Sequence, residues 1–386
     1  MTVAALAAII GLASCATEEF VSGDANGSLN GGNAGKSDLK SVNLKIGSSS
    51  PSTRAEGNSM SNGAVTFNGG FLLFVSDENN ITKVMEITTG LGVQNDTQVD
   101  ISLLTQPDGA DITDVPGHSK SAWVIGNLPG NISAPVTGES LTTLKGKLVG
   151  YASQHDITNV TLFGGSTIVP ENQKLVARFE LAPVVARIEI KKIESAIGSD
   201  ITSFRVDGIF INNYYDEIQL DGYAPNVAVN HEQEGDFALN SLAYPTAENG
   251  YLFDYETGLG VGLGTTSDAG RSYKPSAGDA WAYNLLAPKT FATAASAPHI
   301  VIRLSGITTT SGVNYNDVWY LTISGLKVGL NKVDYLEPGK VYLIDNILFA
   351  QSNIQPDPEM KPIEVAVEVS LVDWQVKDTE VIFGQE

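Results

Sequence analysis

The sequence feature that most constrains the fold is the stretch 175–193, LVARFELAPVVARIEIKKI, in which a proline separates two alternating segments. Alternation of apolar and polar residues is typical of a β-strand that is buried on one face only. The two predicted apolar faces consist of Leu175, Ala177, Phe179 and Leu181, and of Val184, Ala186, Ile188 and Ile190. The opposite face of the second strand, with Arg187 and Glu189, is then expected to be exposed. Pro183 lacks an N–H group, so we expect strand pairing to break there.

The kink at Pro183 is interpreted as the boundary between two β-rich domains, 55–182 and 183–386. A chain of 386 residues has room for two, since domains average roughly 150 residues. The alternative is one long bent strand within a single domain. Apolar runs of strand length recur on both sides, as in FLLFV (71–75) and HIVIRL (299–304). Leucines at helical spacing predict one amphipathic helix within 139–149. The predicted fold class is therefore all-β, with one or two short helices.

The composition limits the partners of this chain. Hydrophobic residues make up 42% of the sequence and charged residues 17%, which is typical of a chain with a folded core. The formal net charge is −21, which argues against binding to nucleic acid and against docking on anionic lipid through charge. The single cysteine, Cys15, cannot form a disulfide within the chain.

The first fifteen residues predict an exported lipoprotein. An apolar run at 3–13 is too short to span a bilayer and has the length of a signal-peptide core. The sequence Leu-Ala-Ser-Cys that follows it looks like a bacterial lipobox, in which Cys15 would be lipidated, although no Lys or Arg precedes the run. The alternative is a buried helix with an isolated cysteine. Residues 16–40 are polar and rich in Gly and Asn, so we expect a flexible tether.

A short strand and a polar loop follow the tether. Val42, Leu44 and Ile46 alternate with polar residues and predict a strand. The loop 47–58 carries a single arginine, Arg54. Exposed loops of this composition are preferred sites of proteolysis.

No catalytic or metal-binding motif stands out. The four histidines, at 118, 155, 231 and 299, lack the clustered spacing of zinc ligands. Asp108, Asp111 and Asp114 do not have EF-hand spacing, and we interpret them as a solvated acidic loop. The glycines of 258–264 do not form a nucleotide-binding motif. A pair of carboxylates for glycoside hydrolysis needs no local motif, but nothing points to one. We therefore predict no enzyme, no cofactor and no metal.

Taken in order, several segments resemble the fimbrillin superfamily of Bacteroidetes, the subunits of type V pili. These segments are the lipobox, the loop with Arg54, the strand FLLFV, WVIGNLP (123–129), ARFELAPVVARIEIKKI and the tail VSLVDWQVKDTEVIF. The resemblance covers nearly the whole chain. It implies two tandem β-sandwich domains of transthyretin-like topology. It also implies a lipidated precursor in the outer membrane, attached there only through its lipid anchor, and then a fimbria at the cell surface.

The resemblance further implies how such a subunit assembles. An arginine-specific surface protease would cut between Arg54 and Ala55 and remove the propeptide 16–54. The first strand, with Val42, Leu44 and Ile46, would leave a groove. A neighbouring subunit, of the same or of a tip or anchor type, would fill this groove by strand addition. The donor strand is expected within 373–383, with Thr379, Val381 and Phe383 on one face.

A second function remains open from the sequence. The chain could instead be a surface lipoprotein that keeps its first strand, never polymerises and binds glycans or host proteins. Such a protein would be expected to expose pairs of aromatic residues. Tyr214 with Tyr215 and Trp281 with Tyr283 are the pairs that the sequence offers. The strand, the arginine loop and the strand-like tail favour the fimbrial subunit.

Overall fold

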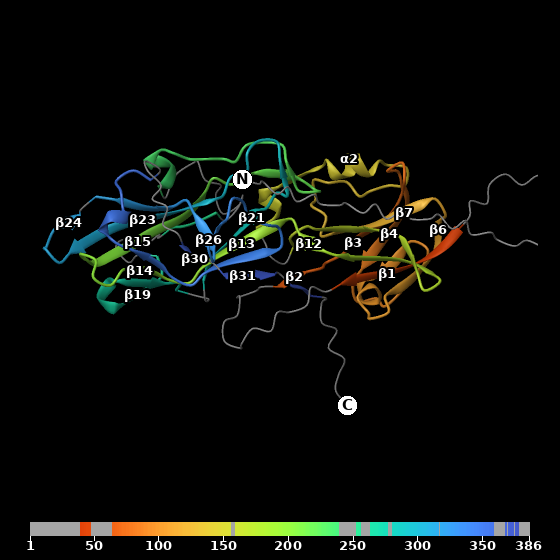
Figure 1. Ribbon diagram of the computed structural model, residues 1–386, viewed down its shortest axis with the longest axis horizontal. Helices are drawn as coiled ribbons and strands as arrows, with labels where there is room; N and C mark the ends of the chain where they lie inside the picture. Colours follow the sequence, from red (N-terminus) through yellow and green to blue (C-terminus); the bar gives the residue numbers. More distant parts are fainter. Residues whose placement is uncertain are drawn as a thin grey trace, which may run out of the picture. The chain divides into compact units, whose positions relative to one another are not determined.

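The structure is a computed structural model and consists mainly of β-strands joined by turns (Figure 1). It confirms the predicted all-β class. The structure describes residues 39–47, 64–155, 159–238, 252–255, 263–276, 280–315, 317–358, 367–368, 370–373 and 375–377. Side chains at 46–47, 64–66, 179–180 and beyond 358 are not described. Among the described residues there are two short α-helices, α1 (Ile101–Leu104) and α2 (Leu141–Lys145). The 3-10 turns lie at Tyr151–Ser153, Glu234–Phe237, Asp268–Gly270 and Gln351–Asn353.

Two sheets contain most of the strands before residue 184. The first has the order β10-β11-β1-β6 and the second β12-β9-β7-β3-β4-β5. The strands of the first are β1 (Leu39–Gly47), β6 (Ala110–Pro116), β10 (Val169–Glu171) and β11 (Lys174–Glu180). Those of the second are β3 (Gly70–Ser76), β4 (Ile81–Thr88), β5 (Gln98–Asp100), β7 (Ser119–Gly126), β9 (Leu162–Thr167) and β12 (Ala182–Pro183).

Three further sheets follow, in the orders β21-β13-β28-β31, β19-β20-β14-β29 and β18-β15-β23-β24, with β25 also on β23. The strands of the first are β13 (Val185–Ile190), β21 (Trp281–Leu286), β28 (Lys340–Ile344) and β31 (Ser370–Asp373). Those of the second are β14 (Ile193–Ser195), β19 (Thr265–Ser267), β20 (Ser272–Lys274) and β29 (Ile347–Phe349). Those of the third are β15 (Ile201–Asn212), β18 (Phe253–Tyr255), β23 (His299–Thr309), β24 (Asn314–Tyr315) and β25 (Trp319–Ile323).

Small sheets connect distant parts of the sequence. β8 pairs β16, β17 pairs β22, β2 pairs β32, and β26 pairs both β27 and β30. Their bounds are β2 (Ala64–Thr66), β8 (Leu148–Gly150), β16 (Glu217–Gln219), β17 (Tyr223–Ala224), β22 (Thr290–Phe291), β26 (Leu326–Val328), β27 (Asn331–Lys332), β30 (Val367–Glu368) and β32 (Gln375–Lys377). Contacts group residues 37–386 into one compact unit. The division into domains 55–182 and 183–386 stays a prediction.

The chain changes sheets at Pro183, but pairing does not break there as the sequence predicted. β11 pairs with β1, β12 pairs with β9, and β13 pairs with β21 and β28. Pro183 lies opposite Leu162 in β12, at the edge of its sheet, where its missing N–H costs no ladder bond. The next residue, Val184, donates its N–H to the Thr161 carbonyl at 3.0 Å. The proline therefore marks a change of partner.

β13 is buried on both faces, so the predicted exposed face with Arg187 and Glu189 is wrong. These side chains are only 8% and 3% exposed. Arg187 Nε lies 2.6 Å from Glu189 Oε1, and Arg187 Nη1 donates to Asn284 Oδ1 at 3.0 Å. Two residues apart on one strand, the charges lie on the same face and compensate each other. This pairing is what allows a central strand to bury them.

The predicted helix at 139–149 is present but shorter. α2 spans Leu141–Lys145, and Leu141 and Leu144 are buried as the leucine spacing predicted. Gly146 follows the last helical residue, and glycine is a poor helix former. Leu148 belongs to β8 and is 37% exposed, so its place in the helix was predicted wrongly.

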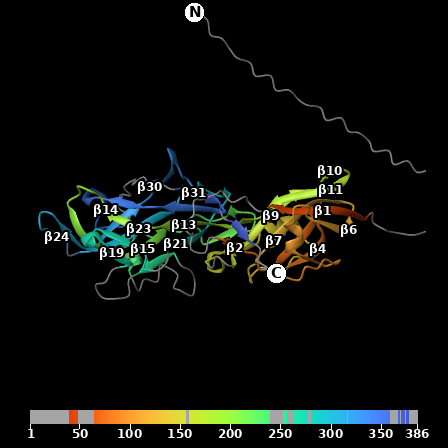
Figure 2. The ribbon, with the colours of Figure 1, turned by 90° about the horizontal axis from the view of Figure 1, so that it is seen from below.

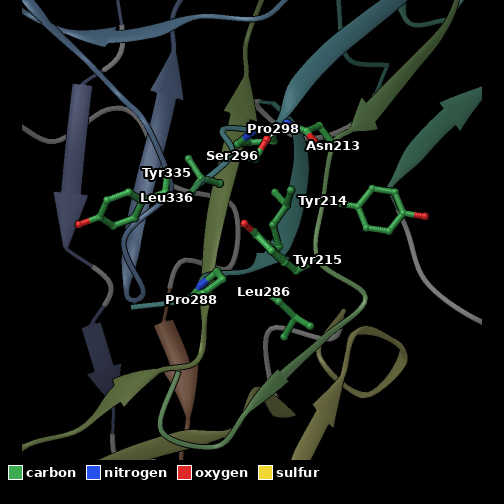
Figure 3. Close-up of a pocket in the computed structure, with 10 residues that line it drawn as sticks. Asn213, Tyr214, Tyr215, Leu286, Pro288, Ser296, Pro298, Tyr335 and Leu336 are labelled. Carbon is green, nitrogen blue, oxygen red and sulfur yellow. Dashed lines mark hydrogen bonds between the residues drawn. The ribbon is translucent and has the colours of Figure 1, made fainter. Parts of the chain in front are cut away.

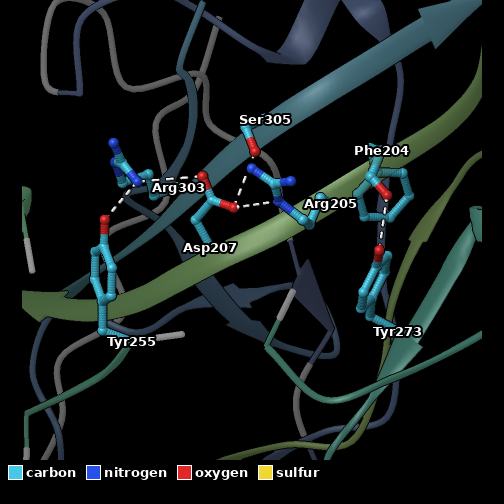
Figure 4. Close-up of polar contacts among 7 residues, drawn as sticks. All are labelled: Phe204, Arg205, Asp207, Tyr255, Tyr273, Arg303 and Ser305. Carbon is cyan, nitrogen blue, oxygen red and sulfur yellow. Dashed lines mark hydrogen bonds and ion pairs between the residues drawn. The ribbon is translucent and has the colours of Figure 1, made fainter. Parts of the chain in front are cut away.

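A polar cluster joins three strands of the sheet that contains β15 (Figure 4). Asp207 accepts hydrogen bonds from Arg205 Nε at 2.8 Å, Ser305 Oγ at 2.9 Å and Arg303 Nη1 at 3.2 Å. Arg303 also donates to the Tyr255 hydroxyl at 2.6 Å. Asp207 is only 8% exposed, and two guanidinium groups compensate its charge. The cluster therefore fixes β15, β18 and β23 side by side.

The edge strand β18 is also tied to a facing sheet through a carboxyl group. Asp254 accepts a hydrogen bond from the hydroxyl of Tyr283, on β21, at 2.7 Å, and Tyr283 is only 1% exposed. Burial raises the pKa of Asp254 above 3.8, although the tyrosine hydrogen bond acts in the opposite direction. A raised carboxyl pKa means that the folded protein holds this proton more tightly than the unfolded chain does.

Asp254→Asn is expected to stabilise the protein above about pH 4. In the wild type, the unfolded chain loses this proton near pH 3.8, whereas the folded protein loses it only at higher pH. The free energy of unfolding therefore falls as pH rises from 3.8 to the raised pKa. Asparagine keeps an acceptor for Tyr283 and removes the titration. Urea denaturation of both proteins from pH 3 to pH 8 checks this, and a stability difference that does not change with pH would contradict it.

Candidate strand-exchange site

The first described strand, β1, lies in the middle of its sheet (Figure 2). It pairs parallel with β11, where Leu44 lies opposite Ala177, and antiparallel with β6, where Val42 lies opposite Ile112. Both edges of β1 are therefore hydrogen bonded. Both partners of β1 lie far from it in the sequence. β6 begins more than sixty residues after the end of β1, and β11 begins more than a hundred and twenty residues after it.

Two apolar side chains of β1 are part of the core, whereas Leu39 at its start is exposed. Val42 and Leu44 are fully buried, and so is Ile112 on β6. Ala177 on β11 is 1% exposed. Burying one valine or leucine side chain is worth roughly 1.5–3 kcal/mol before ordering costs. Removal of β1 would therefore take the buried side chains of Val42 and Leu44 out of the core.

Polar side chains of β1 contact the segment that leads into β6. Asn43 Nδ2 donates to the Asp108 carbonyl at 3.0 Å and to Asp111 Oδ1 at 2.9 Å, and Lys45 Nζ donates to the Pro107 carbonyl at 2.9 Å. The hydrogen bond from Asn43, together with the nearby Lys174, lowers the pKa of Asp111. These groups are exposed, so they add little to stability but define the register of β1. Asp111 belongs to β6 and not to a solvated loop as predicted.

A glycine beside β1 makes close approach of the strand possible. Gly109 has φ +67°, and a Cβ atom there would lie 2.3 Å from the Leu44 carbonyl oxygen. Any larger residue would therefore meet the backbone of the strand in this position. Gly109 was not among the predicted site residues, although the Pro-Asp-Gly run at 107–109 is a recognisable turn signal.

The outer edges of the same sheet are protected from pairing. At one edge β10 is short and contains Pro170, a residue that blocks strand addition. At the other edge, carbonyl groups of β6 are occupied by side chains: Lys83 Nζ donates to Thr113 at 2.9 Å, and Gln94 Nε2 donates to Asp111 at 2.7 Å. The place of β1 is therefore where this sheet would accept a strand, if β1 were removed.

Other predicted site residues lie outside the described part of the structure. These are Cys15, Arg54, Ala55, Thr379, Val381 and Phe383. The backbone of Ile46 belongs to β1, but its side chain is not described. Val42 and Leu44 are thus the predicted residues whose surroundings are known.

The aromatic pairs that a glycan-binding surface was expected to expose are buried. Tyr214, Tyr215, Trp281 and Tyr283 are 6%, 5%, 6% and 1% exposed. Burial also raises the pKa of Tyr214 to about 12. These residues therefore do not form the exposed aromatic pairs that the alternative function would need.

A shallow hollow lies beside one of these pairs (Figure 3). Tyr215, Leu286, Pro288 and Tyr335 are among its lining residues, and its cavity volume is about 10 Å³. This is about the space that one water molecule needs. Among the described residues, no group of three or more His, Cys, Asp or Glu is placed to hold a metal ion. No helix in the described part is long and apolar enough to cross a membrane.

No protein-family model and no curated protein matches the sequence significantly. Solved structures do match the fold. A candidate cell adhesion protein from Bacteroides eggerthii has a TM-score of 0.52 and 15% identity, over 89% of this chain and 97% of that one. One from Parabacteroides distasonis has a TM-score of 0.52 and 15% identity, over 88% and 98%. A fimbrilin (FimA) from Porphyromonas gingivalis has a TM-score of 0.49 and 13% identity, over 87% and 98%. The chain therefore shares its fold with the two candidate cell adhesion proteins from Bacteroides eggerthii and Parabacteroides distasonis.

Proposed function

We propose that this protein is a structural subunit of a surface fimbria and polymerises by exchanging β1 for a strand of another subunit. The observation that carries the proposal is the place of β1 between β11 and β6, with Val42 and Leu44 fully buried. Loss of a central strand exposes two unpaired strand edges and the apolar positions between them at the same time. Such a groove favours addition of an extended segment.

The sequence around β1 supplies a means of releasing it. β1 ends at Gly47, the next strand among the described residues begins at Ala64, and Arg54 lies between them in the sequence. A cut between Arg54 and Ala55 by an arginine-specific surface protease would separate β1 covalently from the rest of the chain. The remaining contacts of β1 are hydrogen bonds and burial, which a strand of similar pattern can replace. In this proposal, Cys15 anchors the precursor in the outer membrane until the cut.

The expected donor is the C-terminal tail of a neighbouring subunit. Thr379, Val381 and Phe383 alternate with Glu380 and Ile382 in the sequence, so they would share one face of a strand in the groove. Contact between the tail of one subunit and the groove of the next does not close on itself, so it propagates a filament. The partners are then other fimbrial subunits, identical ones or tip and anchor types. Support for an adhesive role comes from the candidate cell adhesion proteins that share the fold.

Arg54→Ala is expected to block filament formation, because β1 stays covalently attached and keeps its place. The purified precursor is treated with an arginine-specific protease, the new N-terminus is identified by mass spectrometry, and filaments are counted by negative-stain microscopy. Thr53→Ala is the matched control, since it changes the neighbouring residue and keeps the arginine. Filaments from the Arg54→Ala protein at the wild-type rate would refute this cleavage site.

A further inference from the structure

An ion pair crosses over β1 from one neighbouring strand to the other. Lys174 begins β11 and Asp111 belongs to β6, the two strands on either side of β1 (Figure 2). Lys174 Nζ lies 3.2 Å from Asp111 Oδ2. Adjacent strands are about 4.8 Å apart, so the backbones of β11 and β6 are separated by roughly twice that distance. The lysine side chain therefore reaches across β1 to the carboxylate.

The ion pair crosses β1 at Asn43. In the two ladders of β1, Asn43 is opposite Asp111 on one side and opposite Val176 on the other. Lys174 precedes Val176 by two residues, so the side chains of Lys174, Asn43 and Asp111 lie on the same face of the sheet. Asn43 Nδ2 donates to Asp111 Oδ1 at 2.9 Å, which leaves Oδ2 for Lys174. One carboxylate thus holds both the strand and the lysine that crosses it.

The face that carries this ion pair is the one through which β1 must leave. Val42 and Leu44 are fully buried, and side chains alternate along a strand, so they point to the face opposite Asn43. The core blocks movement in that direction, and β11 and β6 block movement sideways. Lys174 and Asp111 are exposed, with 62% and 51% of their side chains accessible. The ion pair therefore lies on the solvent side, across the path by which a strand leaves or enters.

We propose that Lys174 and Asp111 form a strap that slows the exchange of β1 by closing over the strand in this position. This inference rests on the proposed function, because it concerns the release of β1 and the entry of its replacement. Exposed ion pairs contribute little to stability, and exposed side chains rearrange in picoseconds to nanoseconds. The strap therefore opens many times before β1 leaves, and the release rate is proportional to the fraction of time that the strap is open.

A second ion pair on the same strand provides a matched control. Arg178 lies on β11 four residues after Lys174, so its side chain points to the same face. Its Nη2 donates to Glu171 Oε1, on β10, at 3.0 Å. β10 lies on the side of β11 away from β1, so this pair does not cross β1. Loss of either pair removes one exposed positive charge, but of the two only the Lys174 pair spans β1.

Lys174→Met tests the strap, because methionine removes the charge and keeps an unbranched side chain. The full chain is labelled with a fluorophore at Cys15, its single cysteine, and cut with an arginine-specific protease. Excess unlabelled peptide 37–54 prevents rebinding, and size-exclusion chromatography follows how much labelled fragment stays with the protein. We expect release of β1 to be about three- to fivefold faster than in the wild type. Arg178→Met should release β1 at the wild-type rate. Equal rates for Lys174→Met and the wild type would overturn the strap.

Charge reversal and salt show whether the strap acts as an ion pair. Lys174→Glu places two carboxylates on opposite sides of β1 and should release β1 at least as fast as Lys174→Met. Adding Asp111→Lys restores an ion pair across the strand, and release should return to within about twofold of the wild-type rate. At about 1 M salt the screening length falls to about 3 Å, so the difference between Lys174→Met and the wild type should largely disappear. A double variant that stays as fast as Lys174→Glu, or a difference that salt does not change, would overturn the strap.

Hydrogen exchange of the uncleaved chain gives a readout that needs neither protease nor filaments. The amides of residues 42–45 should exchange about three- to fivefold faster in Lys174→Met than in the wild type, while those of β3 keep their wild-type rates. Unchanged exchange in β1 would overturn the strap, even if filaments form. Faster exchange and faster release in Lys174→Met, with no filaments from any cleaved protein, would overturn the proposed function and leave the strap over β1 in place.

Discussion

Replacing Leu44 by aspartate in the uncleaved chain is expected to lower the free energy of unfolding by about 4 kcal/mol or more. Leu44 is fully buried in β1 between β11 and β6. The substitution removes an apolar side chain from the core and places an unpaired carboxylate there. The cost of burying this charge is avoided only if β1 leaves its place in the sheet or the carboxyl group takes up a proton. Urea denaturation of the uncleaved chain at neutral pH measures the effect.

The control for this substitution lies on the same strand. Leu39 is 57% exposed at the start of β1, so Leu39→Asp should change stability by no more than about 0.5 kcal/mol. After cleavage and release of β1, the Leu44→Asp chain and the wild type become the same mature protein and should assemble alike. Equal stability of the two uncleaved proteins would mean that β1 does not contribute its burial to the fold.

Deleting residues 378–386 from the cleaved subunit is expected to slow filament formation at least about 100-fold. Two apolar side chains of the expected donor strand, Val381 and Phe383, are lost, each worth roughly 1.5–3 kcal/mol when buried, and every 1.4 kcal/mol is tenfold. The deletion begins after β32, so the described fold stays complete. Light scattering after protease treatment follows the rate.

A pair of substitutions controls for the length of the tail. Val381→Asp with Phe383→Asp keeps every residue position and should be as defective as the deletion, because charges cannot enter apolar positions. Glu380→Gln with Glu386→Gln should assemble normally. If the chain without residues 378–386 forms filaments at the wild-type rate, the donor strand lies elsewhere in the sequence.

The strands were largely predictable from the sequence, whereas their partners were not. Alternation in 42–46 identified β1 because side-chain burial repeats every second residue in a half-buried strand. The continuous apolar run 71–75 identified β3, which is buried along most of its length. The pairing of β1 with β11 and β6 joins segments far apart in the sequence, and no local pattern encodes it. The place of β1 in the middle of a sheet, on which the site depends, required the structure.

The structure buries two pairs of residues of types that often face solvent. Arg187 and Glu189 compensate each other's charge and so enter a strand that is covered on both faces. Tyr214 and Tyr215, one of the aromatic pairs that the alternative function would need on the surface, are buried as well. The spacing of apolar residues predicts which face of a strand is buried. Whether polar residues can be buried as well depends on the partners that tertiary contacts give them.

Cryo-electron microscopy of filaments grown from the protease-treated protein tests the central claim most directly. The account predicts that the strand between β11 and β6 belongs to the C-terminal tail of a neighbouring subunit and that residues 39–47 are absent from the filament. A map in which each subunit keeps its own β1 between β11 and β6, with Val42 and Leu44 in their buried positions, would contradict it.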